Sequence, residues 1–177
     1  HRLRGGERVR RCGWEITAVP ADHDKLQECL LYICKKDGKC LLYAHDTGIC
    51  LRDEAWELLA AERYDLVSVD ATMGLAHCPY NHMGIPDVER FLAKLNDMHC
   101  IDGHTLCVCS HFSHNGGLTH AGLLRHAGSW IPAYDGMEVE VGRKRRAEMP
   151  NKNHSTMEPA MQNRRAPRVD NFGFAEE

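Results

Sequence analysis

Five histidine and aspartate side chains stand beside predicted strands of this sequence, where their chemistry can be combined. His23 lies before a predicted β-hairpin, Asp46 follows it, and Asp70 and His111 each follow a further apolar strand. His82 lies in a long loop between Asp70 and the next predicted helix. Imidazole and carboxylate groups together suit zinc, manganese or iron, and an ion held by them would make hydroxide from water at neutral pH.

The hairpin over residues 30–44 is expected to bring two of these groups together. The segment KDGK at 36–39 separates two apolar stretches, and Asp-Gly favours a two-residue turn because both central positions need positive φ. The outer ends of an antiparallel pair are neighbours, so we expect His23 and Asp46 to lie close in space. A surface histidine and a turn aspartate are the alternative interpretation of these two residues.

A second pair has the chemistry of proton transfer. Asp70 would orient and charge the imidazole of His82, which would then protonate a leaving group. His114, in the segment HFSHN, is a candidate either for supporting the metal site or for contacting a substrate phosphate. His45, at the end of the second hairpin strand, is expected to point to the opposite face and to be structural.

An alternation of strands and helices is expected to position these groups, which predicts an α/β fold. Strand patterns cover residues 14–19, 30–35, 40–44, 64–69, 105–109, 130–133 and 137–141. Helix patterns cover 54–62, capped by Asp53, then 86–98 and 118–126. Asp46, Asp70 and His111 then follow strand C-termini, the edge at which ligands gather in α/β sheets.

The composition is that of an ordinary globular protein. Of the 177 residues, 43% are hydrophobic and 27% are charged, and no apolar run approaches the roughly 20 residues that cross a membrane. The net charge of -3 disfavours a general nucleic-acid binder or a membrane-surface protein. The nine cysteines form no CxxC pair, which disfavours a zinc ribbon and predicts reduced thiols in a cytoplasmic protein.

Short motifs surround each of the candidate residues. PADHD contains His23, YAHDTG contains Asp46, VDAT contains Asp70, NHMG contains His82, and HFSHN contains His111. In this order and spacing they resemble the metallo-β-lactamase-fold hydrolases. The resemblance covers about residues 14–141 and is closest to the phosphodiesterase branch, which includes ribonuclease Z and the cyclic-phosphate phosphodiesterase of phosphonate breakdown.

The resemblance implies an αββα sandwich that binds two divalent metal ions, zinc or manganese. It implies that His23, Asp46 and His111 are metal ligands, and that Asp70 and His82 carry out proton transfer in catalysis. The family's His-x-His-x-Asp-His motif, which supplies most of both metal sites, occurs nowhere in this sequence. We therefore expect an N-terminally truncated fragment with at most one partial metal site and an exposed apolar sheet surface.

The predicted organisation has three parts: an N-terminal loop at 1–13, a partial metallo-β-lactamase-like domain at 14–141, and a disordered basic and polar tail at 142–177. The favoured function is a phosphodiesterase that uses a metal-bound hydroxide on a small phosphodiester or a nucleic acid. The alternatives are a lactonase or other ester hydrolase on the same fold, and a non-catalytic remnant or binding module. No membrane partner is expected, and the resemblance implies a homodimer.

Overall fold

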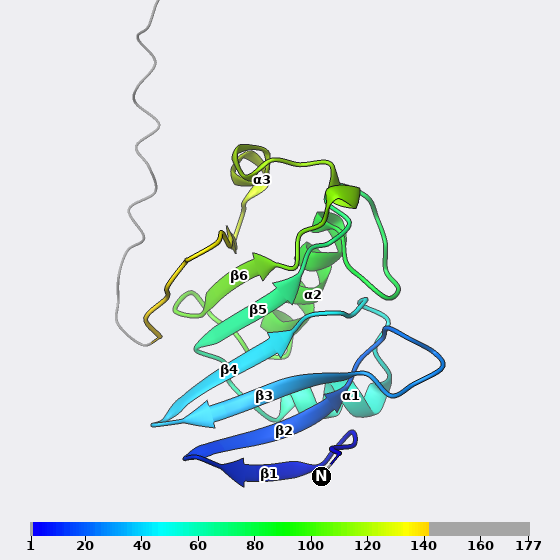
Figure 1. The fold of residues 1–177 in the computed structure, drawn as a ribbon. Helices are drawn as coiled ribbons and strands as arrows, with labels where there is room; N and C mark the ends of the chain where they lie inside the picture. The colour runs from blue at the N-terminus through cyan, green and yellow to red at the C-terminus, as the bar shows by residue number, and fades with distance from the viewer. Residues whose placement is uncertain (1, 142–177) are drawn as a thin grey trace, which may run out of the picture. The chain divides into compact units, whose positions relative to one another are not determined.

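The structure is a computed structural model that describes residues 2–141 of the chain. The tail predicted at 142–177 lies outside the described residues. The elements are β1 (Arg8–Arg11), β2 (Trp14–Pro20), β3 (Leu30–Lys36), β4 (Lys39–Ala44), α1 (Asp53–Ala60), β5 (Leu66–Asp70), α2 (Ile85–Asp97), β6 (Leu106–Ser110), α3 (His120–His126) and β7 (Ile131–Pro132) (Figure 1). A single turn of 3-10 helix, His114–Gly116, lies between β6 and α3.

The strands form one mixed sheet whose spatial order is the chain order, β1 to β7. Strands β1 to β4 pair antiparallel, whereas β4 to β7 pair parallel. The turn between β3 and β4 has φ of 50° at Asp37 and 73° at Gly38, as expected of an Asp-Gly hairpin. Helices α1 and α2 make the parallel connections, so β4, β5 and β6 have their C-terminal ends at one edge.

The N-terminal loop expected at 1–13 is wrong in part, because Arg8–Arg11 forms the edge strand β1. An ion pair of 2.7 Å between Arg10 and Glu15 joins β1 to β2. The hairpin closes through Cys12 and Gly13, whose φ values are 52° and 79°. A Cys-Gly turn therefore adopts the conformation that Asp-Gly adopts elsewhere, and its weaker sequence signal explains the missed strand.

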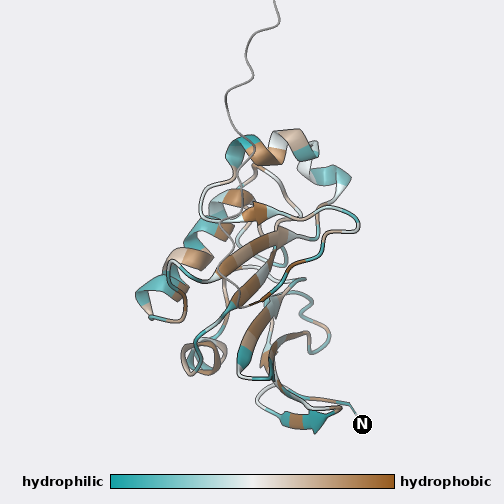
Figure 2. Ribbon diagram, turned by 90° about the vertical axis from the view of Figure 1, so that its left-hand side faces the viewer, coloured by the Kyte–Doolittle hydropathy of each residue, from teal (hydrophilic) through white to brown (hydrophobic). Residues whose placement is uncertain are grey.

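Helices α1 and α2 cover one face of the sheet (Figure 2). The apolar stripe predicted for α2 is buried, and the ring of Phe91 lies 5.3 Å from that of Trp56 on α1. Helix α1 begins at Asp53, so Arg52 is its N-cap and Asp53 lies in the first turn, where an acid suits the helix dipole. None of the helices in the described range is long and apolar enough to cross a bilayer.

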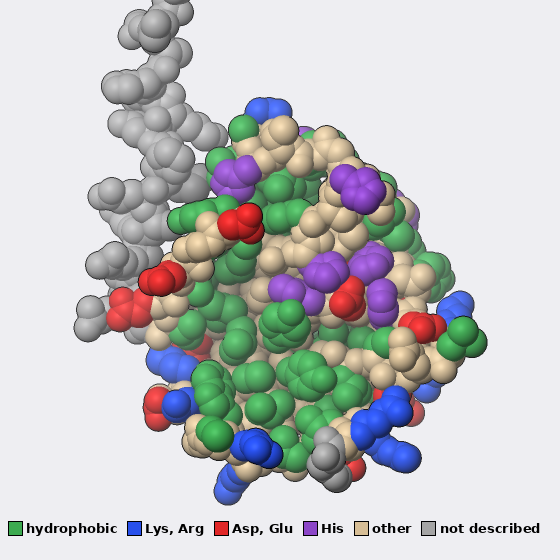
Figure 3. All heavy atoms as spheres, viewed as in Figure 1, with side chains coloured by type: hydrophobic (Ala, Val, Ile, Leu, Met, Phe, Trp, Pro, Cys, Tyr) green, Lys and Arg blue, Asp and Glu red, His purple; other side chains and the backbone are tan. Residues whose placement is uncertain are grey.

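The opposite face of the sheet presents hydrophobic side chains over β2 to β5 (Figure 3). Tyr32 on β3 and Tyr43 on β4 are register partners, and Tyr43 is 44% exposed. Trp14, at the start of β2, is 38% exposed. The described residues therefore form one helix layer and one sheet of the expected αββα sandwich.

The closing strand expected at residues 137–141 is wrong. That segment forms no strand, and the preceding strand, β7, has only two residues, Ile131–Pro132. Proline has no N–H to donate to a sheet ladder, which limits the growth of this edge.

Candidate metal centre

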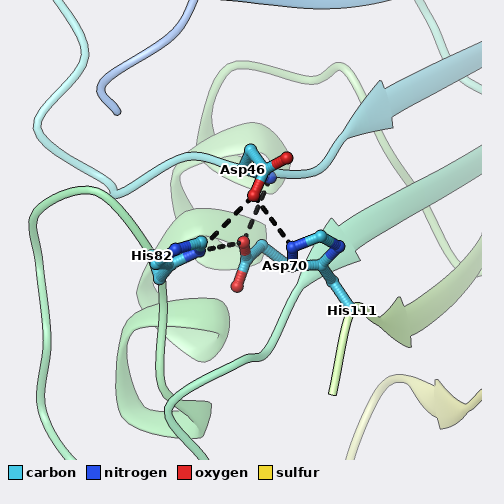
Figure 4. Close-up of side chains that lie close together, drawn as sticks. All are labelled: Asp46, Asp70, His82 and His111. Atoms are coloured by element: carbon cyan, nitrogen blue, oxygen red, sulfur yellow. Dashed lines mark hydrogen bonds and ion pairs between the residues drawn. The ribbon is translucent and has the colours of Figure 1, made fainter. Parts of the chain in front are cut away.

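Four side chains meet at the C-terminal edge of β4, β5 and β6 (Figure 4). Asp46 follows β4, Asp70 is the last residue of β5, and His111 follows β6. His82 comes from the loop between β5 and α2. One potential ligand atom from each residue lies within 4.8 Å of the others, so strand ends that are far apart in sequence converge on one place.

The cluster is made of two close pairs. His111 Nε2 lies 2.8 Å from Asp46 Oδ1, and His82 Nδ1 lies 2.8 Å from Asp70 Oδ2. The pairs approach each other where His82 Nδ1 lies 3.8 Å from Asp46 Oδ1. Ligand atoms about 2.0–2.2 Å from one ion lie roughly 3–4 Å apart, so these separations are close to those of a shared ion.

Asp70 is fully buried, and backbone groups fix its carboxylate. The N–H of Thr72 donates to Oδ1 at 2.9 Å, and the N–H of Asp46 donates to Oδ2 at 3.1 Å. These donors replace the water that the buried charge has lost. A neutral His82 would donate its Nδ1–H to Asp70, which leaves the other ring nitrogen unprotonated.

Three of the six non-glycine residues with positive φ in the described range lie at or next to the cluster. Asp46, Asn81 and His111 have φ of 52°, 65° and 60°, in the left-handed region. This region costs a non-glycine residue about 1–3 kcal/mol, and strain of this kind gathers at functional sites. Aspartate, asparagine and histidine tolerate it better than most residues, which fits the residue types found here.

His23 lines the same pocket as Asp46 but lies outside the four-residue cluster. Its Nδ1 donates to the carbonyl oxygen of Asn81 at 2.9 Å, and its ring centroid lies 4.8 Å from that of His82. A histidine that donates one N–H to a backbone carbonyl presents its other nitrogen in the form that binds metal. The structure thus brings His23 to the site, and its role as a ligand stays a prediction.

A glycine holds the loop of His23 against the loop that follows β4. The N–H of Asp22 donates to Thr47 Oγ1 at 3.1 Å, and the N–H of Gly48 donates to the carbonyl of Asp22 at 2.8 Å. A Cβ on Gly48 would lie 2.3 Å from the carbonyl oxygen of Pro79. Only glycine allows these three segments to pack this closely.

Two further histidines lie outside the four-residue cluster. His114 is exposed and does not line the pocket, so the structure does not bring it to the cluster, and its contact with substrate stays a prediction. His45 does not point away, because its ring lies 5.7 Å from that of His111 and its Nε2 lies 2.8 Å from Ser68 Oγ. Burial, and then the neighbouring His111, lower the pKa of His45. The left-handed turn at Asp46 ends the strand alternation on which the expectation depended.

The cluster opens into a pocket of about 340 Å³. Among the described residues, no lysine or arginine lines this pocket. The charged or ionisable partners of the two carboxylates within the cluster are imidazoles, and histidine side chains surround an acidic group on this face (Figure 3). A divalent cation would balance the two carboxylates, and this set of imidazole and carboxylate donors suits zinc or manganese.

Comparison with known proteins identifies the fold. No protein-family model matches the sequence, and no curated protein matches it significantly. Among solved structures, the metallo-beta-lactamase fold protein YhfI from Bacillus subtilis aligns with 76% of this chain and 52% of its own, at 14% identity and a TM-score of 0.56. A variant of the CmlA beta-hydroxylase, an enzyme of Streptomyces venezuelae, aligns with 73% of this chain and 31% of its own, at 13% identity and a TM-score of 0.50.

A third similar structure is Igni18, a metallo hydrolase from Ignicoccus hospitalis, with 18% identity, a TM-score of 0.48, and coverage of 74% of this chain and 55% of its own. The chain spans about half the length of YhfI. At these identities the likeness concerns the fold alone. The described part of this chain has, in part, the metallo-β-lactamase fold.

Proposed function

We propose that this chain belongs to a metal-dependent hydrolase whose substrate is a phosphodiester. One observation carries the proposal: the Asp70–His82 pair lies beside Asp46 and His111, and His82 lines a pocket that no lysine or arginine lines among the described residues. The fold shared with YhfI supports it but does not fix the reaction.

Asp46 and His111 would hold the divalent ion, zinc or manganese, and His23 would add a donor from the pocket wall. When bound, the ion supplies a water of lowered pKa and offsets the charge of the phosphate. Without it, the two carboxylates would repel an anionic phosphodiester. Hydrolysis of this substrate should therefore depend strictly on the metal.

The Asp70–His82 pair would provide the proton for the leaving oxygen. Asp70 fixes the ring by accepting from Nδ1, while His82 also lines the pocket, so its other nitrogen is the one available to substrate. Asp70 thereby orients His82 for its proposed role as the general acid. Departure of an alkoxide needs a general acid.

The test is hydrolysis of a dinucleoside monophosphate, whose leaving group is an alkoxide, measured with zinc or manganese and with a chelator. His82→Ala should lower kcat by roughly 10²–10⁴-fold, the usual contribution of a general acid. His104→Ala, at an exposed histidine outside the pocket, should leave kcat unchanged.

A parallel assay with a lactone distinguishes a phosphodiesterase from an ester hydrolase and from a non-catalytic protein. Turnover of the lactone without turnover of the phosphodiester would replace the proposal with an ester hydrolase on the same fold. No turnover of either substrate by a chain shown to hold metal would favour a non-catalytic binding module.

A further inference from the structure

A second, larger pocket of about 670 Å³ lies at the opposite end of β4 from the cluster. It is formed by the tips of two hairpins, β1–β2 and β3–β4, together with the residues that follow α1. Six of its fifteen lining residues are basic and four are acidic, although the chain as a whole has a net charge of -3. Positive charge is therefore concentrated at this end of the sheet.

Three of the six basic residues are already neutralised by acids. Lys39 Nζ lies 3.0 Å from Asp65 Oδ1, Arg10 pairs with Glu15, and Lys35 pairs with Glu62. These pairs account for three of the four acids in the pocket. These pairs are structural, and they leave Arg11, Lys36 and Arg63 with Asp37 as the remaining acid of the lining, an excess of two positive charges.

The excess charge surrounds an aromatic ring. Lys36 is the register partner of Lys39, whose charge Asp65 offsets. Lys36 Nζ lies 5.4 Å from the ring centroid of Trp14. Arg11 is the register partner of Trp14, and no ion pair of Arg11 is found in the described part of the chain. Trp14 is 38% exposed, whereas Trp56 and Trp130 are 7% and 2% exposed.

We propose that this pocket binds a segment of single-stranded nucleic acid, with one base on Trp14 and the adjoining phosphates near Arg11 and Lys36. An exposed indole gives a base a flat surface for stacking, and flanking cations attract the backbone; together they are the usual means of binding single strands. An acidic peptide would use the cations but not the ring. The hydrolase proposal is independent of this one, because the six residues of β4 separate the two pockets by about 20 Å.

The test is fluorescence anisotropy of a labelled eight-nucleotide oligothymidylate with the full chain, in EDTA so that the Asp–His cluster holds no metal. Trp14→Ala should weaken binding about tenfold, because stacking on an aromatic ring is worth that much per base. Trp14→Phe, which keeps an aromatic ring, should recover most of the affinity. Lys36→Gln should reduce the dependence of log Kd on log salt by about one, the effect of one lost phosphate contact.

Two controls locate the site. Arg52→Gln removes an exposed basic residue outside the pocket and should leave both affinity and salt dependence unchanged. His111→Ala should also bind normally, so failure of the hydrolase proposal and failure of this one are distinguishable. Equal affinity of the wild type and Trp14→Ala, or equal competition by inorganic polyphosphate of the same charge, would overturn the proposal, as would no binding at low salt.

Discussion

The two ends of β4 carry charge in opposite ways. At the N-terminal end, Lys39 lies 3.0 Å from Asp65, and further lysines and arginines exceed the acids around them. At the C-terminal end, Asp46 and Asp70 have imidazoles as partners, and no lysine or arginine of the described residues lines the pocket. One end is arranged to receive an anion and the other to receive a cation.

The paired charges at the N-terminal end of β4 stabilise the fold, whereas we propose that the carboxylates at its C-terminal end bind a cation. An acid with its own lysine is satisfied when the chain folds and has no need of a further partner. Two carboxylates within reach of each other repel, and a bound cation would offset this repulsion. Positive φ values occur at both ends, at Cys12 and Asp37 in the hairpin turns and at Asp46 and His111 beside the cluster.

The largest expected effect comes from removing the charge of Asp70. Asp70→Asn keeps the shape of the side chain but removes the negative charge that lies 2.8 Å from His82 Nδ1. We expect kcat for a phosphodiester to fall by roughly 10²–10⁴-fold with little change in KM. Asp65→Asn, the matching change at the other end of the sheet, should leave kcat unaltered. Equal losses in the two variants would remove the distinction between the ends.

Asp87, in the first turn of α2, holds the loop that carries His82. Its carboxylate is fully buried, accepts from the N–H of Cys78 at 2.6 Å and lies 2.7 Å from His77 Nδ1. Asp87→Asn should lower the free energy of unfolding by about 1–3 kcal/mol, measured in urea, because a buried charged contact is lost. Asp97 is exposed at the end of α2, and Asp97→Asn should change the free energy of unfolding by less than about 0.5 kcal/mol. Indistinguishable stabilities would show that Asp87 does not anchor this loop.

Backbone strain at His111 can be measured by comparing the stabilities of two substitutions at this position. His111→Gly should be more stable than His111→Ala by about 1 kcal/mol, because glycine adopts the observed φ of 60° freely. At Glu57, exposed within α1, the order should reverse, since glycine weakens a helix relative to alanine. The same order at both positions in thermal or urea denaturation would argue against strain at the cluster.

The smallest expected effect is the change in the free energy of unfolding at low pH that comes from the Lys39–Asp65 pair. Partial burial by itself raises the pKa of Asp65. The N–H of Cys40 and the ammonium of Lys39 lower this pKa by more than burial raises it, so the pKa lies below its ordinary value of 3.8. A lowered pKa means that the pair stabilises the fold above the ordinary value and loses this contribution as the pH falls through the lowered one. Asp65→Asn should therefore reduce the loss of stability below about pH 4. If the free energy of unfolding fell with pH in the same way in the wild type and in Asp65→Asn, the pair would not contribute this pH dependence.

Local rules predicted most of what positions the candidate site. The Asp-Gly hairpin, the apolar stripe of α2 and the strand ends at Asp46, Asp70 and His111 each follow from turn chemistry or from side-chain periodicity, and the structure has them in these places. The sequence order of these residues also implied that they share one edge of the sheet. The pairing of His82 with Asp70 came from the resemblance as well as from chemistry.

The missed features depend on contacts that sequence periodicity does not encode. Strand β1 exists because β2 offers it an edge and Glu15 offers Arg10 a partner. His45 joins the ring contacts of His111 because the backbone turns left-handed at Asp46. The pocket at the hairpin tips requires two turns to lie side by side. Each is a tertiary arrangement of residues whose local patterns are unremarkable on their own.

The central claim is that the Asp–His cluster holds a divalent cation, and the most direct test is metal content. The purified chain would be dialysed against zinc or manganese, then against metal-free buffer, and analysed by elemental mass spectrometry. We predict about one ion per wild-type chain, as expected of a single site, and almost none in Asp46→Ala or His111→Ala. A wild type without metal, or variants that retain as much as the wild type, would contradict the account.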